Sequence, residues 1–169
     1  MPFLHSSVLG PIDLAARLQA GSAALFPTDT LPALGALPKY AKQLWEIKRR
    51  PRDKPLILMA ASADELFEWA SPYALKDALD MGRRYWPGPL TLVIPAFGDV
   101  VDALNPGAFT IGMRVPACEF TKHLLGLSGP LATTSANLAG SASSLSADEA
   151  AECFPRLPLL GPMPWPNAS

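Results

Sequence analysis

The densest cluster of charge in the sequence is the segment Lys48-Arg-Arg-Pro-Arg-Asp-Lys54, in which five of seven residues are basic. Pro51 and Pro55 restrict its backbone, so the cations are presented with reduced conformational freedom. A polyphosphate would supply the missing negative charge, because arginine binds phosphate oxygens through a planar fork and lysine binds them as a point charge. The alternative is a solvated basic loop at a helix end, where Lys and Arg stabilise the helix dipole.

The stretch Leu131–Gly140 reads as an apolar strand that ends in small hydroxyl and amide side chains. Ligands usually bind at strand ends in α/β sheets, and Ser135 and Asn137 can donate and accept hydrogen bonds there. Ser, Asn and Gly also populate ordinary turns for backbone reasons. Taken alone, the segment is compatible with a nucleotide site and with a plain turn.

A second polar segment, Phe26-Pro-Thr-Asp-Thr30, also follows an apolar run. Thr28 and Thr30 flank Asp29, and this polar trio suits either an amino-acid substrate or an Asx-type turn.

Strand alternation over Thr110-Ile-Gly-Met-Arg114 places Thr110 and Arg114 on one face. An arginine on so apolar a strand needs a partner. That partner is either a substrate carboxylate or phosphate, or a structural Asp or Glu.

Several chemistries are excluded by what the sequence lacks. His5 and His123 are the only histidines, and neither has the spacing of a metal site or of a base for Ser135. There is no GxxxxGK[ST] loop and no GxGxxG fingerprint. Cys118 and Cys153 are far apart without a CxxC partner, so we expect small buried thiols and no protein-bound metal.

The composition predicts one compact domain with its own core. The chain has 169 residues, of which 49% are hydrophobic and 17% charged, and a formal net charge of -1. That charge argues against general electrostatic binding of nucleic acid. No run reaches the roughly 18 apolar residues of a membrane span, and the first ten residues do not resemble a signal peptide, so we predict a cytoplasmic protein without a membrane segment.

Apolar periodicity predicts an alternating α/β pattern and a mixed sheet. We expect helices over 12–20 and 39–48, further helices beginning near 62, 71 and 146, and one around 120 that stops at Gly126. Capping-box patterns at Ser62 and Ser146 mark two of these starts. The expected strands are 22–26, 56–60, 90–94, 109–115 and 131–134.

The last segment, 154–169, carries five prolines. Proline removes a backbone donor, so we expect neither a regular helix nor a central strand there. The predicted organisation is a domain over 1–153 followed by a tail over 154–169, which is either an extended arm packed on the domain or a loose end.

Taken together, five segments resemble the threonylcarbamoyl-AMP synthase family, the YrdC-like domain. They occur in family order and are Phe-Pro-Thr-Asp-Thr (26–30), Lys-Arg-Arg-Pro-Arg-Asp-Lys-Pro-Leu (48–56), Trp-Pro-Gly-Pro-Leu-Thr-Leu-Val (86–93), Met-Arg-Val-Pro (113–116) and Ala-Thr-Thr-Ser-Ala-Asn-Leu-Ala-Gly (132–140). The resemblance implies a twisted mixed parallel/antiparallel sheet with flanking helices and a concave basic face. It also implies synthesis of threonylcarbamoyl-AMP and pyrophosphate from ATP, L-threonine and bicarbonate, the first step of threonylcarbamoyladenosine formation in tRNA.

The same resemblance assigns roles to individual residues. It implies that ATP, with Mg²⁺, is bound by Lys48, Arg50, Lys54, Thr110, Ser135 and Asn137, with Lys48 and Arg50 as the catalytic cations. It places Thr28, Thr30, Arg114 and Ser135 around L-threonine. tRNA or tRNA-modification proteins are further implied partners.

The sequence departs from the family pattern at several positions. Pro32 and Ala33 replace the usual Tyr-Gly, and Met59 and Cys118 stand where histidine is common. Ala139 replaces a serine, and Leu145 lies near a position that is normally threonine or serine. The family's Ser-Thr-Val segment is not found. These changes concern the threonine pocket and lid more than the nucleotide cradle. They leave an alternative function open, a paralogue that binds nucleotide or double-stranded RNA or tRNA without turnover.

Overall fold

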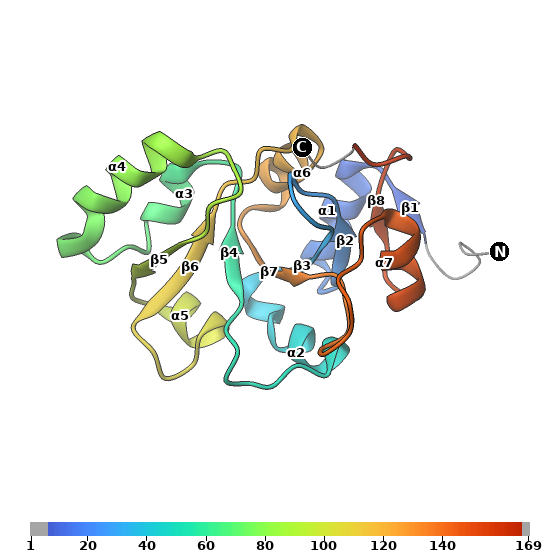
Figure 1. Ribbon diagram of the computed structural model, residues 1–169, viewed down its shortest axis with the longest axis horizontal. Helices are drawn as coiled ribbons and strands as arrows, with labels where there is room; N and C mark the ends of the chain where they lie inside the picture. Colours follow the sequence, from blue (N-terminus) through green and yellow to red (C-terminus); the bar gives the residue numbers. More distant parts are fainter. Residues whose placement is uncertain (1–6, 167–169) are drawn as a thin grey trace.

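The computed structural model describes residues 7–166, which form a single twisted sheet flanked by helices (Figure 1). Within these residues the sheet has eight strands in the order β1-β8-β2-β3-β7-β4-β6-β5. The strands are β1 (Val8–Leu9), β2 (Ala24–Phe26), β3 (Ala33–Ala36), β4 (Ile57–Met59), β5 (Leu92–Pro95), β6 (Thr110–Arg114), β7 (Leu131–Ser135) and β8 (Leu159–Leu160). The sheet contains both parallel and antiparallel strand pairs, which confirms the predicted mixed α/β class.

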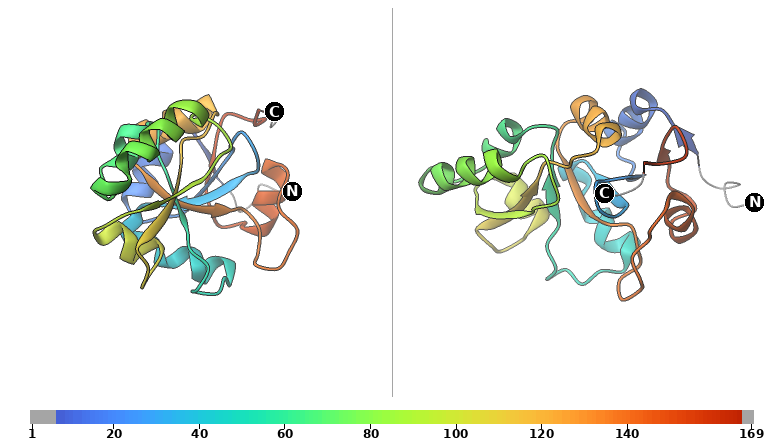
Figure 2. Two further views of the ribbon diagram at one scale, coloured as in Figure 1. Left: turned by 60° about the vertical axis from the view of Figure 1, so that its left-hand side comes forward. Right: turned by 45° about the horizontal axis from the view of Figure 1, so that its top comes forward.

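Helices lie along both sides of this sheet. They are α1 (Pro11–Gln19), α2 (Lys42–Lys48), α3 (Ala63–Phe67), α4 (Leu75–Tyr85), α5 (Asp99–Leu104), α6 (Glu119–Ser128) and α7 (Ala147–Cys153), with 3-10 turns η1 (Pro38–Tyr40) and η2 (Pro72–Ala74). In Figure 2, α3, α4 and α6 lie along one side, and α2 and α5 lie along the other. None of the described helices is both long and apolar enough to cross a membrane.

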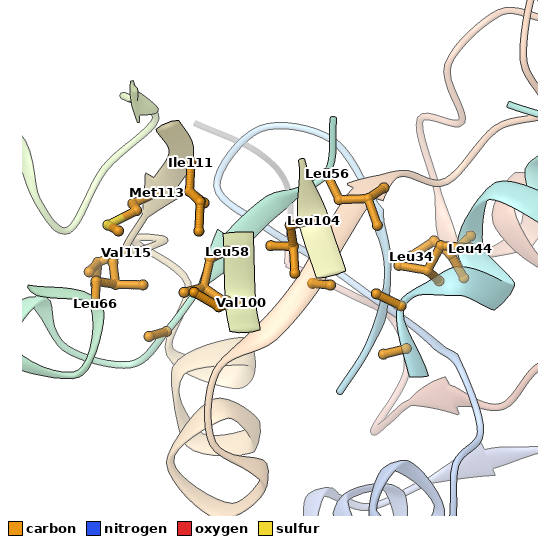
Figure 3. Close-up of a cluster of buried hydrophobic side chains, with 14 of the residues drawn as sticks. Leu34, Leu44, Leu56, Leu58, Leu66, Val100, Leu104, Ile111, Met113 and Val115 are labelled. Carbon is orange, nitrogen blue, oxygen red and sulfur yellow. The ribbon is translucent and has the colours of Figure 1, made fainter. Parts of the chain in front are cut away.

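Strand alternation divides the buried side chains into two clusters. On β4, Leu58 belongs to the larger cluster, which includes Leu34 and Leu104 (Figure 3), whereas Met59 belongs to a smaller cluster around α1 and α6. Successive side chains of a strand point to opposite faces, so one short strand supports both clusters. Each fully buried aliphatic side chain contributes about 1.5–3 kcal/mol, and the two clusters together hold the strand ends in place.

The tail is built into the sheet. β8 lies between β1 and β2 and pairs in parallel with both, so the expectation that the tail holds no central strand is wrong. The flanking prolines do not interrupt the ladder because they are not required as donors. Leu159 and Gly161 donate to the carbonyls of Ser7 and Leu9, and Pro158 contributes only its carbonyl, which accepts from Leu25. The segment therefore packs on the domain as an extended arm.

Most predicted helices and strands are present, and the differences have local causes. The sequence pattern did not reveal β3 or α5, because Ala33–Ala36 has four residues that are small except for Leu34, and α5 has only six residues. The predicted stop of α6 at Gly126 is wrong, since the helix continues to Ser128 and ends at Gly129, whose φ is 82°. Ser146 caps α7 by accepting from the Glu149 amide, whereas the hydroxyl of Ser62 bonds only the Glu65 carboxylate.

Gly35 of β3 provides a test of this packing. A Cβ at this position would lie 2.8 Å from a ring carbon of Phe26, which is fully buried. We expect Gly35→Ala to lower the free energy of unfolding by about 1–3 kcal/mol, because the buried ring or the backbone must shift to admit the methyl group. Urea denaturation measures the change.

Gly126→Ala is the matched control. Gly126 lies in α6 with nothing within 4 Å of an added Cβ, so alanine should raise stability by about 0.5–1 kcal/mol through better helix propensity. Equal effects of the two substitutions would contradict the close packing of β2 on β3.

Candidate functional site

The centre of the site is the side chain of Lys48, the last residue of α2. Arg49 follows in the left-handed conformation with φ 55°, which ends the helix and turns the chain into the basic loop. Lys48 is only 1% exposed. Its Nζ donates to Thr134 Oγ1 at 2.9 Å, to the Ser135 carbonyl at 2.9 Å and to Ser135 Oγ at 3.3 Å. The structure thus joins the basic segment directly to the end of β7.

All three partners of this ammonium are neutral. Among residues 7–166, Lys48 forms no ion pair with a carboxylate within 4 Å. Burial, together with the positive charges of Arg50 and Lys54, lowers the pKa of Lys48 from 10.5 to about 8. A buried cation without a counter-charge is unfavourable unless a ligand supplies one, so this position is suited to an anion.

The loop after α2 arranges two further cations beside Lys48. Arg50 donates from Nε to the Lys54 carbonyl at 3.3 Å and from Nη2 to the Pro55 carbonyl at 3.0 Å. Trp45 also donates to the Lys54 carbonyl, at 2.9 Å, which fixes the loop on α2. Arg50 keeps three of its five N–H donors after these two bonds, and the Lys54 side chain is exposed. The loop is therefore ordered by its own carbonyls while its charges remain accessible.

Asn137 orders the turn after β7. Its Nδ2 donates to the carbonyls of Leu138 and Ser141, and the Ala139 amide donates to the Lys48 carbonyl, which ties this turn to α2. Its Oδ1 is buried and has no hydrogen-bond partner within the described part of the chain. A buried acceptor left unsatisfied costs about 1–3 kcal/mol, and a donor on a ligand would recover it.

Thr110, the sixth residue predicted to bind nucleotide, lies at the start of β6. It is half-buried, and its carbonyl accepts from Asn105 Nδ2 at 2.9 Å. No hydrogen bond found in residues 7–166 connects it to the Lys48 group. The structure brings Lys48, Ser135 and the Asn137 turn together and does not join Thr110 to them.

Beside the Lys48 group lies a cavity of about 190 Å³. All four residues predicted to surround L-threonine line it, namely Thr28, Thr30, Arg114 and Ser135. The rest of its wall is formed by Leu31, Pro32, Ala33, Ile57, Met59, Thr91, Thr133 and Thr134. Threonine and serine residues of β7, of the turn after β2 and of the position before β5 therefore line one cavity together with Arg114, and apolar side chains complete the wall.

The guanidinium of Arg114 has a structural acid as its partner. Nη2 donates to Asp29 Oδ1 at 2.5 Å, Nη1 donates to Thr30 Oγ1 at 3.2 Å, and Nε donates to the Gly88 carbonyl at 3.0 Å. Of the two partners left open by the sequence, Asp29 is the one present. Thr28 supports this corner because its hydroxyl donates to the Leu31 carbonyl at 2.7 Å and accepts from the Thr30 amide.

Sequence reasoning missed several residues of the cavity wall. Thr91 belongs to the family-like segment 86–93, from which no site residue was predicted, yet it lines the cavity. Thr133 and Thr134 stand next to the predicted Ser135 on β7, and both line the cavity, while the hydroxyl of Thr134 also accepts from Lys48 Nζ. Asp29 was recognised as polar, but nothing in the sequence paired it with Arg114.

Some departures from the family pattern lie in this wall and others do not. Pro32, Ala33 and Met59 line the cavity. Leu145 lines an adjoining cavity of about 510 Å³, which shares Thr28, Thr30 and Pro32 with the first and is closed on one side by Met163–Pro166 of the tail. Cys118 is a buried residue preceding α6 and lines neither of these two cavities.

The fold and the site define a class of α/β protein in which an anion site and a small polar cavity lie side by side on one mixed sheet. The Sua5/YciO/YrdC family profile, described as "Telomere recombination", matches residues 16–158. The chain belongs to this family.

Curated relatives carry the name threonylcarbamoyl-AMP synthase. The protein of Pyrococcus abyssi is 40% identical over 144 residues, which cover 83% of this chain and 42% of that protein. The protein of Bacillus subtilis is 37% identical over 145 residues, covering 81% of this chain and 41% of that protein. The chain therefore spans less than half the length of these two relatives.

Solved structures show the same fold. Pyrococcus abyssi Sua5 complexed with L-threonine matches with a TM-score of 0.83 and 35% identity, covering 89% of this chain and 46% of that one. Escherichia coli YciO matches with a TM-score of 0.75 at 23% identity, covering 92% and 80% of the two chains, and supports the fold alone.

The buried ammonium of Lys48 predicts a pH-dependent stability. Its folded-state pKa of about 8 lies below the ordinary 10.5, so the unfolded chain binds more protons between these pH values and stability rises with pH through that range. We expect the wild type to gain up to about 3 kcal/mol relative to Lys48→Met between pH 7.5 and 10. At pH 7.5 Lys48→Met should be at least as stable as the wild type, since it removes an unpaired buried charge.

Urea denaturation at the two pH values measures this difference. Lys42→Met, an exposed lysine of the same helix, is the control and should follow the wild type. Parallel pH curves for the wild type and Lys48→Met would show that the ammonium is not desolvated.

Proposed function

We propose that this chain synthesises threonylcarbamoyl-AMP and pyrophosphate from ATP, L-threonine and bicarbonate. The observation that carries the proposal is the Lys48 ammonium, which is buried, bonded only to neutral oxygens and adjacent to a small polar cavity. Names of relatives at 37–40% identity support the reaction, and the threonine complex of Pyrococcus abyssi Sua5 supports the amino acid.

The proposed reaction needs positioning and charge neutralisation more than covalent help from side chains. The amine of threonine adds to carbon dioxide derived from bicarbonate and loses a proton, which gives a carbamate. A carbamate oxygen then attacks the α-phosphorus of ATP, and pyrophosphate leaves with the electron pair of the broken P–O bond. Lys48, Arg50 and Lys54 would stabilise the negative charge on the transferred and leaving phosphates.

The residues of the two sites divide these tasks. Arg114 retains two N–H donors after its bonds to Gly88, Thr30 and Asp29, enough for a substrate carboxylate. Ser135 belongs to both the cavity and the Lys48 group, so it connects the amino acid to the nucleotide. The unpaired Oδ1 of Asn137 would accept a hydrogen bond from the nucleotide or an ordered water.

Mg²⁺ would accompany ATP. Within residues 7–166 no group of three His, Cys, Asp or Glu side chains could hold a metal ion. We propose that the cation is bound mainly by the phosphates of ATP and by water, because Mg²⁺ keeps several of its waters and needs few protein carboxylates.

The proposal extends to a cytoplasmic location and to transfer of the product to tRNA. An acyl-adenylate type of product is reactive and must be consumed by a group-transfer step. Direct contact with RNA phosphates would fall on the 48–54 loop, because the net charge of -1 offers no general attraction.

Pyrophosphate release tests the reaction. The wild type should release pyrophosphate only when ATP, threonine and bicarbonate are all present. Lys48→Met and Arg50→Ala should reduce release at least 100-fold, because each removes a cation from the phosphate site. Arg84→Ala, an exposed arginine of α4, is the control and should retain wild-type release.

Two other outcomes are informative. ATP binding without turnover in the wild type would favour the alternative of a paralogue that binds nucleotide or RNA. Normal turnover in both Lys48→Met and Arg50→Ala would refute the assignment of the phosphate site.

Thr28 tests the amino-acid cavity separately. Thr28→Ala removes the hydroxyl that bonds Leu31 and Thr30, so the Arg114 corner loosens while the Lys48 group is untouched. We expect the KM for threonine to rise about 10-fold or more, with the KM for ATP changed less than 3-fold, consistent with the loss of one or two hydrogen bonds. Thr28→Ser keeps the hydroxyl and should stay near the wild type. A larger effect on the KM for ATP than on the KM for threonine would contradict the assignment of Thr28 to the amino-acid cavity.

A further inference from the structure

The ion pair between Arg114 and Asp29 is one of the least exposed charged features of the described chain. The guanidinium is 10% exposed and the carboxylate 6% exposed, and their closest atoms are 2.5 Å apart. Asp29 comes from the turn after β2 and Arg114 from the end of β6, so the pair connects two strands that are not neighbours in the sheet.

This pair sets the charge of the amino-acid cavity. Of the described residues that line the cavity, Arg114 is the only charged one. Asp29 is paired with it and does not line the cavity, so the guanidinium and its carboxylate together contribute no net charge. The cavity therefore differs from the Lys48 site next to it, where no carboxylate balances the ammonium.

A neutral, bipolar cavity distinguishes ligands by their charge. A carboxylate that enters without its own cation leaves two negative groups around one guanidinium in a poorly solvated place. A zwitterion brings its own ammonium, so the sum of charges stays at zero. A cation without a carboxylate would add an uncompensated positive charge beside the balanced Arg114–Asp29 pair.

We propose that Asp29 is a specificity-determining residue that makes the cavity select a zwitterionic α-amino acid over a carboxylic acid lacking the amine. The proposal rests on the function proposed above, because it takes this cavity to be the amino-acid site. Asp29 acts through Arg114, as a positioning residue that holds the guanidinium plane and offsets its charge.

A purely structural role of Asp29 leads to a different expectation. If Asp29 only held Arg114 in place, Asp29→Asn would weaken every ligand carboxylate to a similar extent. If it offsets the charge, Asp29→Asn leaves Arg114 with an uncompensated positive charge and should strengthen the binding of a plain carboxylate.

Calorimetric titration without ATP, at pH 7, distinguishes the two. The probes are L-threonine and 3-hydroxybutanoate, which has the carboxylate and hydroxyl of threonine and no amine. We expect the wild type to bind threonine at least 10-fold more tightly than 3-hydroxybutanoate. In Asp29→Asn the affinity for 3-hydroxybutanoate should rise about 10-fold and the preference for threonine should disappear, whereas Asp29→Glu should restore the preference at least in part.

Three results would overturn the proposal. They are equal wild-type affinity for the two ligands, parallel weakening of both ligands in Asp29→Asn, and an unchanged preference in that variant. Circular dichroism checks that the variants fold. If Asp29→Asn does not fold, threoninamide, which keeps the ammonium but lacks the carboxylate, replaces it as a test on the wild type and should bind at least 10-fold more weakly than threonine.

Pyrophosphate release by the wild type, measured in parallel, separates this proposal from the function. Threonine-dependent release together with an unchanged preference in Asp29→Asn refutes the role of Asp29 alone. Absence of both release and threonine binding refutes the function, and the role of Asp29 with it. If the wild type releases no pyrophosphate but the ligand preferences are as expected, the role of Asp29 is supported and the synthase function is refuted.

Discussion

The burial of one ammonium without a carboxylate organises this site. Lys48 is held at the end of α2, where Arg49 turns the chain away, and its Nζ reaches the last residues of β7. The Asn137 turn is tied to the same residue through the bond from the Ala139 amide to the Lys48 carbonyl. The burial of this ammonium among neutral oxygens lowers its pKa and leaves its charge without a counter-charge from the protein.

The buried cations Lys48 and Arg114 differ in how their charges are balanced. Lys48 has neutral partners and a lowered pKa, so it remains short of negative charge. Arg114 has Asp29 within 2.5 Å and is balanced before any ligand arrives. The proposed polyanion and zwitterion would each complete a different charge balance, so the proposed function requires no competition between them. Ser135 lines the cavity and also accepts from the Lys48 ammonium, so it belongs to both sites.

Local patterns predicted most of the fold, and the errors occurred where tertiary pairing decides. Helices and strands with strong periodicity were recognised, but β3 was not, because Ala-Leu-Gly-Ala acquires its strand conformation by pairing with β2 and β7. The prolines of the tail led to the wrong expectation that it holds no central strand, again because tertiary pairing decides where a strand forms. Proline cannot donate, yet the amides of Leu159 and Gly161 donate to β1 and the carbonyl of Pro158 accepts from Leu25, a pairing that the sequence alone could not indicate.

The sequence by itself determined which chemical groups are present, namely the five cations of the 48–54 loop and the polar strand ends at 26–30 and 131–140. It also determined a motif order that is specific to one family. Only the tertiary structure decided which of these groups meet. The Arg114–Asp29 pair joins residues 85 positions apart, and the Lys48–Thr134 bond joins residues 86 positions apart. Periodicity reports on neighbours within a few residues along the chain, so it identifies the face on which a side chain lies. The partner across the sheet is set by strand order and register, and these depend on the whole fold.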